Sequence, residues 1–197
     1  MVDNGALLAA GLELMRRNGK PLTKIAGTGR SMKYTLANGE TVRVRTCNDH
    51  ILIVLSDKHY GSDAKLNIEG TDWLLLVVPE VERTPGNVRA YLVPTSVAVE
   101  AARSSHNQWL DSNPNTRGDN RTWNLWFRDD EKTDNFDKVW SQYRLKGHAE
   151  TQQAVGSAPV SDDPVNVKAE VESARQRISR AAGVPPEAVR ITIDFAL

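Results

Sequence analysis

A run of six consecutive apolar residues at 73–78 constrains the fold of this chain more than any other segment. Successive side chains of a strand point to opposite faces, so a strand without polar residues is buried on both. A shorter run at 51–55 has the same character. Strands of this kind need a layer of structure on each side, which predicts a layered α/β protein.

The flanking segments predict the layers. Asn38 and Gly39 tolerate positive φ and separate two strand-like segments, which indicates a β-hairpin. Helical spacing of apolar residues, with Asn4 as the expected cap, opens the chain. The expected elements are strands at 32–36, 41–46, 51–55, 73–78 and 89–94, and helices at 5–17, 95–110 and 136–143. We therefore expect a central mixed β-sheet with flanking helices, in an α/β or α+β layered domain.

The chain is expected to divide into a core and an appendage. Residues 1–148 form the predicted core, with a Trp-rich part near its end, and residues 149–162 have the composition of a linker. Residues 163–197 predict a helix with an apolar stripe, followed by a short strand at 190–195. A piece of this size buries too little surface to fold alone, so we expect it to dock on the core or on a partner subunit.

Cysteine usage and hydropathy indicate the compartment. Cys47 is the single cysteine, so no internal disulfide can form, and we expect a buried, unreactive thiol in a reducing cytoplasm. No apolar run reaches the ~18 residues that cross a bilayer, and no signal peptide is visible. We expect no membrane partner, no cofactor and no metal site. The histidines and aspartates between 49 and 63 are interpreted as a polar loop.

Charge is zero overall but sorted along the chain. The 25 basic and 25 acidic residues cancel, which excludes a strongly basic nucleic-acid coat. Residues 15–48 nevertheless contain eight basic residues and one acidic residue, whereas residues 49–82 contain two basic and seven acidic residues. Neutrality therefore leaves room for one local basic patch.

The segment 41–46 predicts how two cations of that patch are arranged. Val42 and Val44 alternate with Arg43 and Arg45, so the guanidiniums share the face opposite the valines. The candidate nucleic-acid-binding residues are Arg16, Arg17, Arg30, Lys33, Arg43 and Arg45. Such a patch would contact phosphates. The alternative is that these residues pair with the acidic segment as a solvated ionic surface.

An aromatic block follows a polar loop at 111–122. Trp123, Trp126 and Phe127 lie close together in the segment 121–128, which begins with Arg121 and ends with Arg128. Rings of this kind pack in cores, form protein interfaces or stack on unpaired bases. We take the three rings as interface candidates, with core packing and base stacking as open alternatives.

Three segments together resemble a known family: TVRVRT at 41–46, GTDWLLLVVPE at 70–80 and AYLVPTSV at 90–97. Their order resembles the PD-(D/E)XK nuclease superfamily, particularly small resolvase-like members, and ELMRRNG at 13–19 resembles its opening helix. The resemblance spans roughly residues 5 to 110. It implies Mg²⁺-dependent cleavage of nucleic acid in members with an intact acidic-x-Lys motif.

The matching motif positions here are Arg43 and Arg45, and the preceding strand has no acidic residue. An arginine repels a metal ion, so the resemblance implies a degenerate, non-catalytic nuclease fold that associates with DNA. A protein-interaction or regulatory module acting as a homo-oligomer is the alternative. A third hypothesis, an active metal-dependent nuclease, requires a migrated carboxylate such as Glu13, Glu40 or Asp72.

Overall fold

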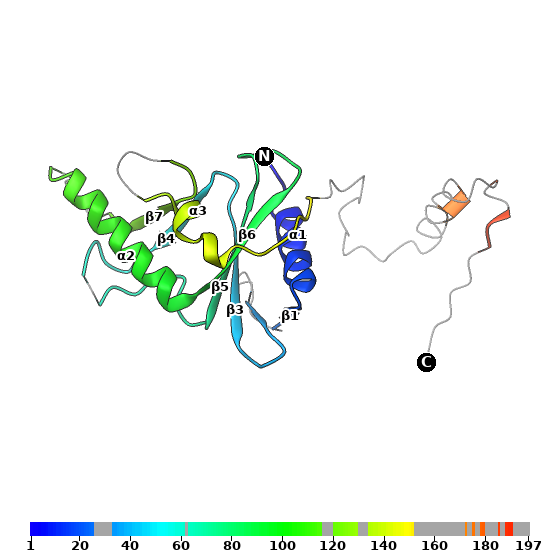
Figure 1. Cartoon of the computed structure of the whole chain (residues 1–197), viewed down its shortest axis with the longest axis horizontal. Coiled ribbons are helices and arrows are strands. Elements are labelled where there is room, and N and C mark those ends of the chain that lie inside the picture. Colours follow the sequence, from blue (N-terminus) through cyan, green and yellow to red (C-terminus); the bar gives the residue numbers. More distant parts are fainter. Residues whose placement is uncertain are drawn as a thin grey trace. The chain divides into compact units, whose positions relative to one another are not determined.

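Strand β5 (Trp73–Pro79) is buried on both faces from Leu74 onward, as its apolar run predicts. It pairs in parallel with β3 (Thr41–Thr46) and antiparallel with β6 (Val88–Pro94). Strands β2 (Lys33–Thr35) and β1 (Thr23–Lys24) extend the sheet beyond β3, in the order β1-β2-β3-β5-β6 (Figure 1). The predicted mixed sheet with flanking helices is confirmed.

The structure is a computed structural model that describes residues 1–25, 33–61, 63–115, 120–129 and 134–151, with scattered positions between 172 and 190. The chain divides into two compact units, Met1–Val155 and Gly156–Leu197. In the second unit, the described positions from Glu172 to Ser179 are helical, in agreement with the predicted helix. The strand predicted at 190–195 lies outside the described residues except for Arg190, and docking of this unit stays a prediction.

Helix α1 (Asn4–Arg17) covers one face of the main sheet. Its N-cap is Asp3 instead of the expected Asn4, because the Asp3 carboxylate accepts the N–H of Ala6 at 3.0 Å. The apolar stripe of α1 packs in one cluster with Leu75 and Val77 of β5 and with the valines of β3. This cluster is the first of two cores.

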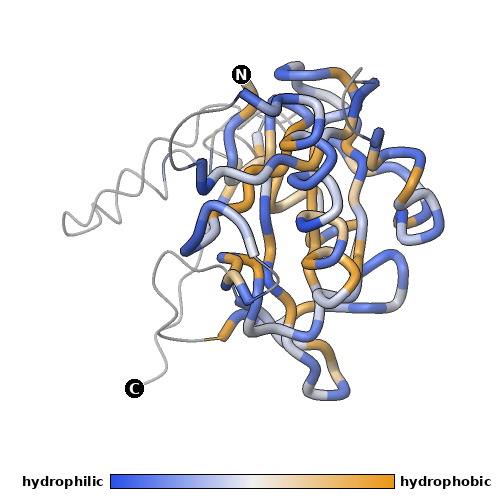
Figure 2. The backbone as a smooth tube through the Cα atoms, turned by 90° about the vertical axis from the view of Figure 1, so that its left-hand side faces the viewer, coloured by the Kyte–Doolittle hydropathy of each residue, from blue (hydrophilic) through white to orange (hydrophobic). Residues whose placement is uncertain are grey.

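The second core lies on the opposite face of the sheet. Helix α2 (Thr95–Ser112) packs there with a separate two-stranded sheet of β4 (Ile51–Leu55) and β7 (Thr122–Trp126). The short helix α3 (Phe136–Val139) and the 3₁₀ turn η1 (Ser141–Tyr143) replace the single predicted helix. Hydrophobic stretches of the backbone gather in the interior between these layers (Figure 2). No helix among the described residues is long and apolar enough to cross a bilayer.

Strand β4 differs from its prediction. Its apolar run predicts burial on both faces, but Ile53 and Leu55 are 47% and 51% exposed. The reason is that β4 pairs with β7 instead of joining the main sheet, so only Leu52 and Val54 face the core. The outer face of this small sheet is left with exposed apolar side chains.

The first residues of the predicted linker, 149–151, pack on the first unit. Ala149 and Thr151 are buried, and their backbones bond to the start of β6 and to the preceding turn. The carbonyl of Ala149 accepts the N–H of Val88 at 2.9 Å, and Thr151 donates its N–H to Gly86 at 2.8 Å. These residues therefore belong to the first unit.

Gly11 sets how closely α1 approaches the sheet. A Cβ placed on Gly11 would meet Cγ2 of Val77 at 2.3 Å, well inside van der Waals contact. A glycine in a helix interior is unfavourable by about 1 kcal/mol relative to alanine. The close contact with β5 explains why a glycine fits this position.

We expect Gly11→Ala to lower the free energy of unfolding by about 1–2 kcal/mol, because overpacking outweighs the gain in helix propensity. Denaturant titration measures this change. The control is the same substitution in a Val77→Ala background, which removes the clashing methyl group and should shrink the loss. A Gly11→Ala variant more stable than wild type would contradict the packing argument.

Candidate functional site

Lys33, Arg43 and Arg45 share one face of the main sheet. Lys33 lies directly opposite Arg43 across the β2–β3 pair, and Arg45 follows two residues later. Arg43 and Arg45 lie beside Leu74 and Leu76 of β5, which belong to the core opposite α1. The cations therefore face away from α1, as the alternation with Val42 and Val44 predicts.

The apolar cluster of the second layer does not extend over this face, and the backbones of Ile53 and Glu69 cover part of it. Among the described residues, the buried cluster opposite α1 takes members from β4 to β7 and from α2 and α3, but none from β1, β2 or β3. We call the surface formed by Lys33, Thr35, Arg43 and Arg45 the cationic face; each of these residues is partly exposed. Neither β2 nor β3 contains an acidic residue.

The two guanidiniums are held by backbone carbonyls. Arg45 Nη2 donates to the carbonyl of Ile53 at 2.9 Å, on the edge of β4 that faces away from β7. Arg43 Nη2 donates to the carbonyl of Glu69 at 3.1 Å. The pKa of Arg43 is lowered, first by burial and then by repulsion from Arg45. Two positive charges thus share a partly dehydrated region, where an anion would relieve their repulsion.

Arg16 and Arg17 do not join this face. They lie on α1, on the other side of the sheet, and both bond to Glu13 at 2.7–2.8 Å. These bonds lower the pKa of Glu13 to about 2. Arg17 also donates to the carbonyl of His148 at 2.6 Å. The predicted set of six is therefore not one surface, and Arg30 lies outside the described residues.

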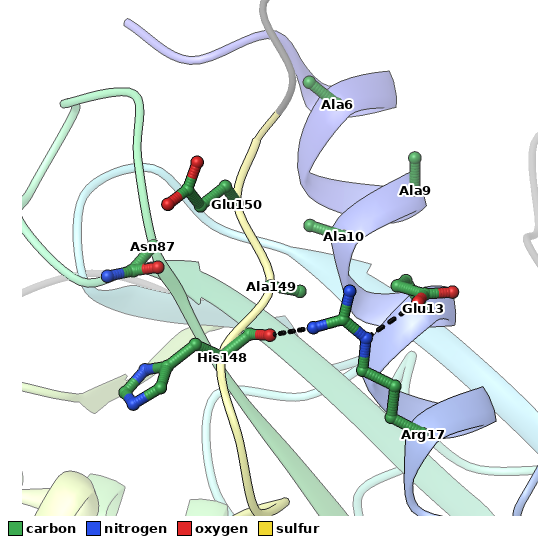
Figure 3. A pocket seen from close by; sticks show the side chains of 9 residues that line it. All are labelled: Ala6, Ala9, Ala10, Glu13, Arg17, Asn87, His148, Ala149 and Glu150. Atoms are coloured by element: carbon green, nitrogen blue, oxygen red, sulfur yellow. Dashed lines mark hydrogen bonds and ion pairs between the residues drawn. The ribbon is translucent and has the colours of Figure 1, made fainter.

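A groove of about 650 Å³ runs between α1 and residues 148–150 (Figure 3). Its α1 wall consists of Ala6, Ala9 and Ala10, with Glu13 and Arg17 at one end. Glu150 lies on the opposite wall. Arg17 is bonded to Glu13 and to the His148 carbonyl, so the groove offers no concentrated positive charge to an anion.

The three carboxylates named as catalytic candidates are each held by local hydrogen bonds. Glu40 accepts from Trp73 Nε1 at 3.0 Å. Asp72 accepts from the N–H and hydroxyl of Thr41, both at 2.7 Å, and these bonds lower its pKa. Glu13 lies on α1. Among the described residues, no three His, Cys, Asp or Glu side chains are placed to hold a metal ion.

Other nucleophile candidates are also engaged or inert. Burial raises the pKa of the Cys47 thiol to about 12, as expected of an unreactive cysteine. Ser105 donates its hydroxyl to the carbonyl of Asn124 at 2.8 Å, and His106 Nε2–H donates to the carbonyl of His59. Burial lowers the pKa of His106. Serine and histidine thus bond to separate groups and form no nucleophile–base pair.

The aromatic block is mostly core. Trp123 and Phe127 are each 1% exposed, so their prediction as interface residues is wrong. The alternation of β7 turns them inward, and His106 stacks on Trp123 at 4.5 Å between ring centroids. Trp126 faces outward and is half-buried, with the guanidinium of Arg128 4.9 Å from its ring centre.

A buried polar network was not predicted. The Arg89 side chain is 7% exposed and pairs with Asp137 at 2.6 Å, and the Tyr91 hydroxyl donates to the same carboxylate. His50 Nε2–H donates to the carbonyl of Pro79 at 2.7 Å, and its ring also contacts Arg89. The sequence feature that indicates this network is Arg89, a charged residue inside an otherwise apolar strand. We interpret the network as structural, because it joins β6 to α3.

Comparison of the chain with models of known protein families, with curated protein sequences and with solved structures found no match in any of the three.

We expect Asp137→Ala to lower the free energy of unfolding by about 2–4 kcal/mol, since it removes the closest carboxylate from the buried charge of Arg89 and leaves, among the described residues, only Glu80 at 4.0 Å. The matched control is Asp129→Ala, which removes an exposed ion pair with Lys138 and should cost less than about 1 kcal/mol. Denaturant titration of both variants checks this. Equal losses would show that the buried network contributes no more than a surface pair.

The lowered pKa of Glu13 predicts a pH-dependent contribution to stability. The contribution is fully present above its unfolded value of 4.5 and is lost as pH falls toward 2. Glu13→Gln should therefore be less stable than wild type at pH 6, and the gap should close between pH 4.5 and 2. Thermal unfolding across this range measures the gap, and a constant gap contradicts the assignment.

Proposed function

We propose that this protein associates with DNA through the cationic face and does not cleave it. The observation that carries the proposal is the convergence of Lys33, Arg43 and Arg45 on one partly exposed sheet face, where burial and then repulsion from Arg45 lower the pKa of Arg43. A phosphate placed there neutralises the repulsion, and guanidinium groups bind phosphate oxygens in a bidentate way. Contacts to phosphates do not depend on the base sequence of the DNA.

The absence of cleavage follows from the residues on β3. The resemblance to PD-(D/E)XK nucleases aligns Arg43 and Arg45 with the positions that hold the metal-binding acid and the lysine in those enzymes. Two guanidiniums repel a divalent cation but attract the phosphate that such an enzyme would cut. We infer a degenerate nuclease-like core that keeps substrate affinity without the catalytic motif. The single cysteine fits a reducing, cytoplasmic setting.

A protein-interaction module is the second candidate, favoured by the alanine-walled groove along α1. Small side chains let a partner backbone approach closely, and the groove volume falls in the range of known ligand-binding clefts. Light scattering at two concentrations tests its homo-oligomeric form. A mass that stays that of one chain argues against it.

Fluorescence anisotropy with labelled DNA at ~50 mM salt tests the leading proposal. We expect Arg43→Gln with Arg45→Gln to weaken binding at least tenfold and to reduce the slope of log K against log salt by about 1.4 for a single strand. The matched control, Arg16→Gln with Arg17→Gln, removes the same charge from the opposite face and should change affinity less than twofold.

Two results would contradict the proposal. One is an absence of DNA binding by the wild type at this salt concentration, where phosphate contacts are strongest. The other is an equal loss of affinity in both double variants. Arg45 also donates a hydrogen bond to the Ile53 carbonyl of β4, so thermal unfolding of each variant is measured to detect a loss of stability. Lys33→Gln removes one charge from the same face and serves as a milder variant.

A further inference from the structure

A small cavity lies between α2 and the edge of β7 that faces away from β4. Its volume is about 140 Å³, and its lining includes Trp109 and His106 from α2 and Thr122, Asn124 and Trp126 from β7. A cavity of about 150 Å³ in a protein holds one benzene ring. The space therefore suits a single six-membered ring.

The lining combines aromatic faces with an amide. Trp109 and Trp126 are both half-buried, so each presents part of its indole to the cavity. Trp109 is held in place by near-parallel stacking on His106, with 5.9 Å between centroids and 12° between ring planes. Asn124 Oδ1 is shielded from solvent and has no hydrogen-bond partner among the described residues. A ligand in the cavity reaches this acceptor once the Asn124 amide turns toward it, which would satisfy a polar atom that is otherwise without a partner.

The cavity and the Arg45 guanidinium lie at opposite edges of the two-stranded β4–β7 sheet, because Ser105 of α2 donates to the Asn124 carbonyl on the β7 edge that faces away from β4. Arg45 binds the carbonyl of Ile53, and Ile53 lies directly opposite Asn124 across the β4–β7 pair. The carbonyl of Ile53 points away from β7, so this is a close, non-hydrogen-bonded pair with Cα atoms ~4.5 Å apart. The exposed side chain of Ile53 thus forms an apolar step between the Arg45 guanidinium and the amide that lines the cavity.

We propose that this cavity accepts one unpaired pyrimidine base of a single DNA strand whose phosphates lie on the cationic face. The inference rests on the proposed function and extends it to a preference for unpaired DNA. The pyrimidine ring stacks against Trp109 and Trp126, and its edge exchanges hydrogen bonds with Asn124 after a small turn of the amide, which carries both a donor and an acceptor. A neighbouring base lies over Ile53 and Leu55.

The test compares two single strands of equal length and charge, an oligothymidylate and an abasic deoxyribose-phosphate oligomer, at ~50 mM salt. We expect the wild type to bind the oligothymidylate at least fivefold more tightly, the lower end of what base stacking on an aromatic residue contributes. Trp109→Leu should bring this ratio close to one. Trp73→Leu, which removes a half-buried tryptophan on the α1 side of the sheet, should keep it.

The outcomes separate this inference from the proposed function. Equal binding of both strands by the wild type overturns the base site while leaving phosphate binding intact. This comparison uses the wild-type protein alone, so it does not depend on the folding of a variant. A ratio that Trp109→Leu leaves unchanged places the base elsewhere and also overturns it. If the wild type binds neither strand, the proposed function fails and the inference falls with it.

Discussion

Burial of β5 on both faces is the constraint on which the rest of the structure depends. Six of its side chains have no polar group, so each face needs its own apolar layer. Helix α1 supplies one layer, and α2 with the β4–β7 sheet supplies the other. The two layers differ in extent, because only α1 also covers the valines of β3. The opposite face of β2 and β3 is consequently free to carry charge.

Successive side chains of a strand point to opposite faces, so the charged residues of β3 all lie on the face that α1 does not cover. On β3, Val42 and Val44 pack on the α1 side, and Arg43 and Arg45, which alternate with them, face the other way. Arginines on α1 pair with Glu13 and are compensated locally. Overall neutrality therefore coexists with one cationic face, and this face adjoins an outer sheet surface with exposed isoleucine and leucine.

Local patterns predicted the elements and the orientation of the side chains on β3. The hairpin around Asn38 and Gly39, the burial of β5 and the opposed valines and arginines all follow from turn chemistry and from a period of two. The partner of β4 could not be predicted, because an apolar run does not show which sheet a strand joins. That choice exposes Ile53 and buries Trp123. Arg16 and Arg17 likewise lie apart from Arg43 because of the face that α1 covers. Counting charges along the sequence does not show which face that is.

The central claim is that nucleic acid contacts the face of β2 and β3 that α1 does not cover. Chemical-shift mapping of backbone amides during titration with a single-stranded oligothymidylate tests it most directly. The account predicts that the largest shifts fall on Lys33–Thr35, Thr41–Thr46 and Ile53, with little change on Arg16 and Arg17 of α1. Shifts concentrated on α1 and on residues 148–150, with β2 and β3 unchanged, would contradict it.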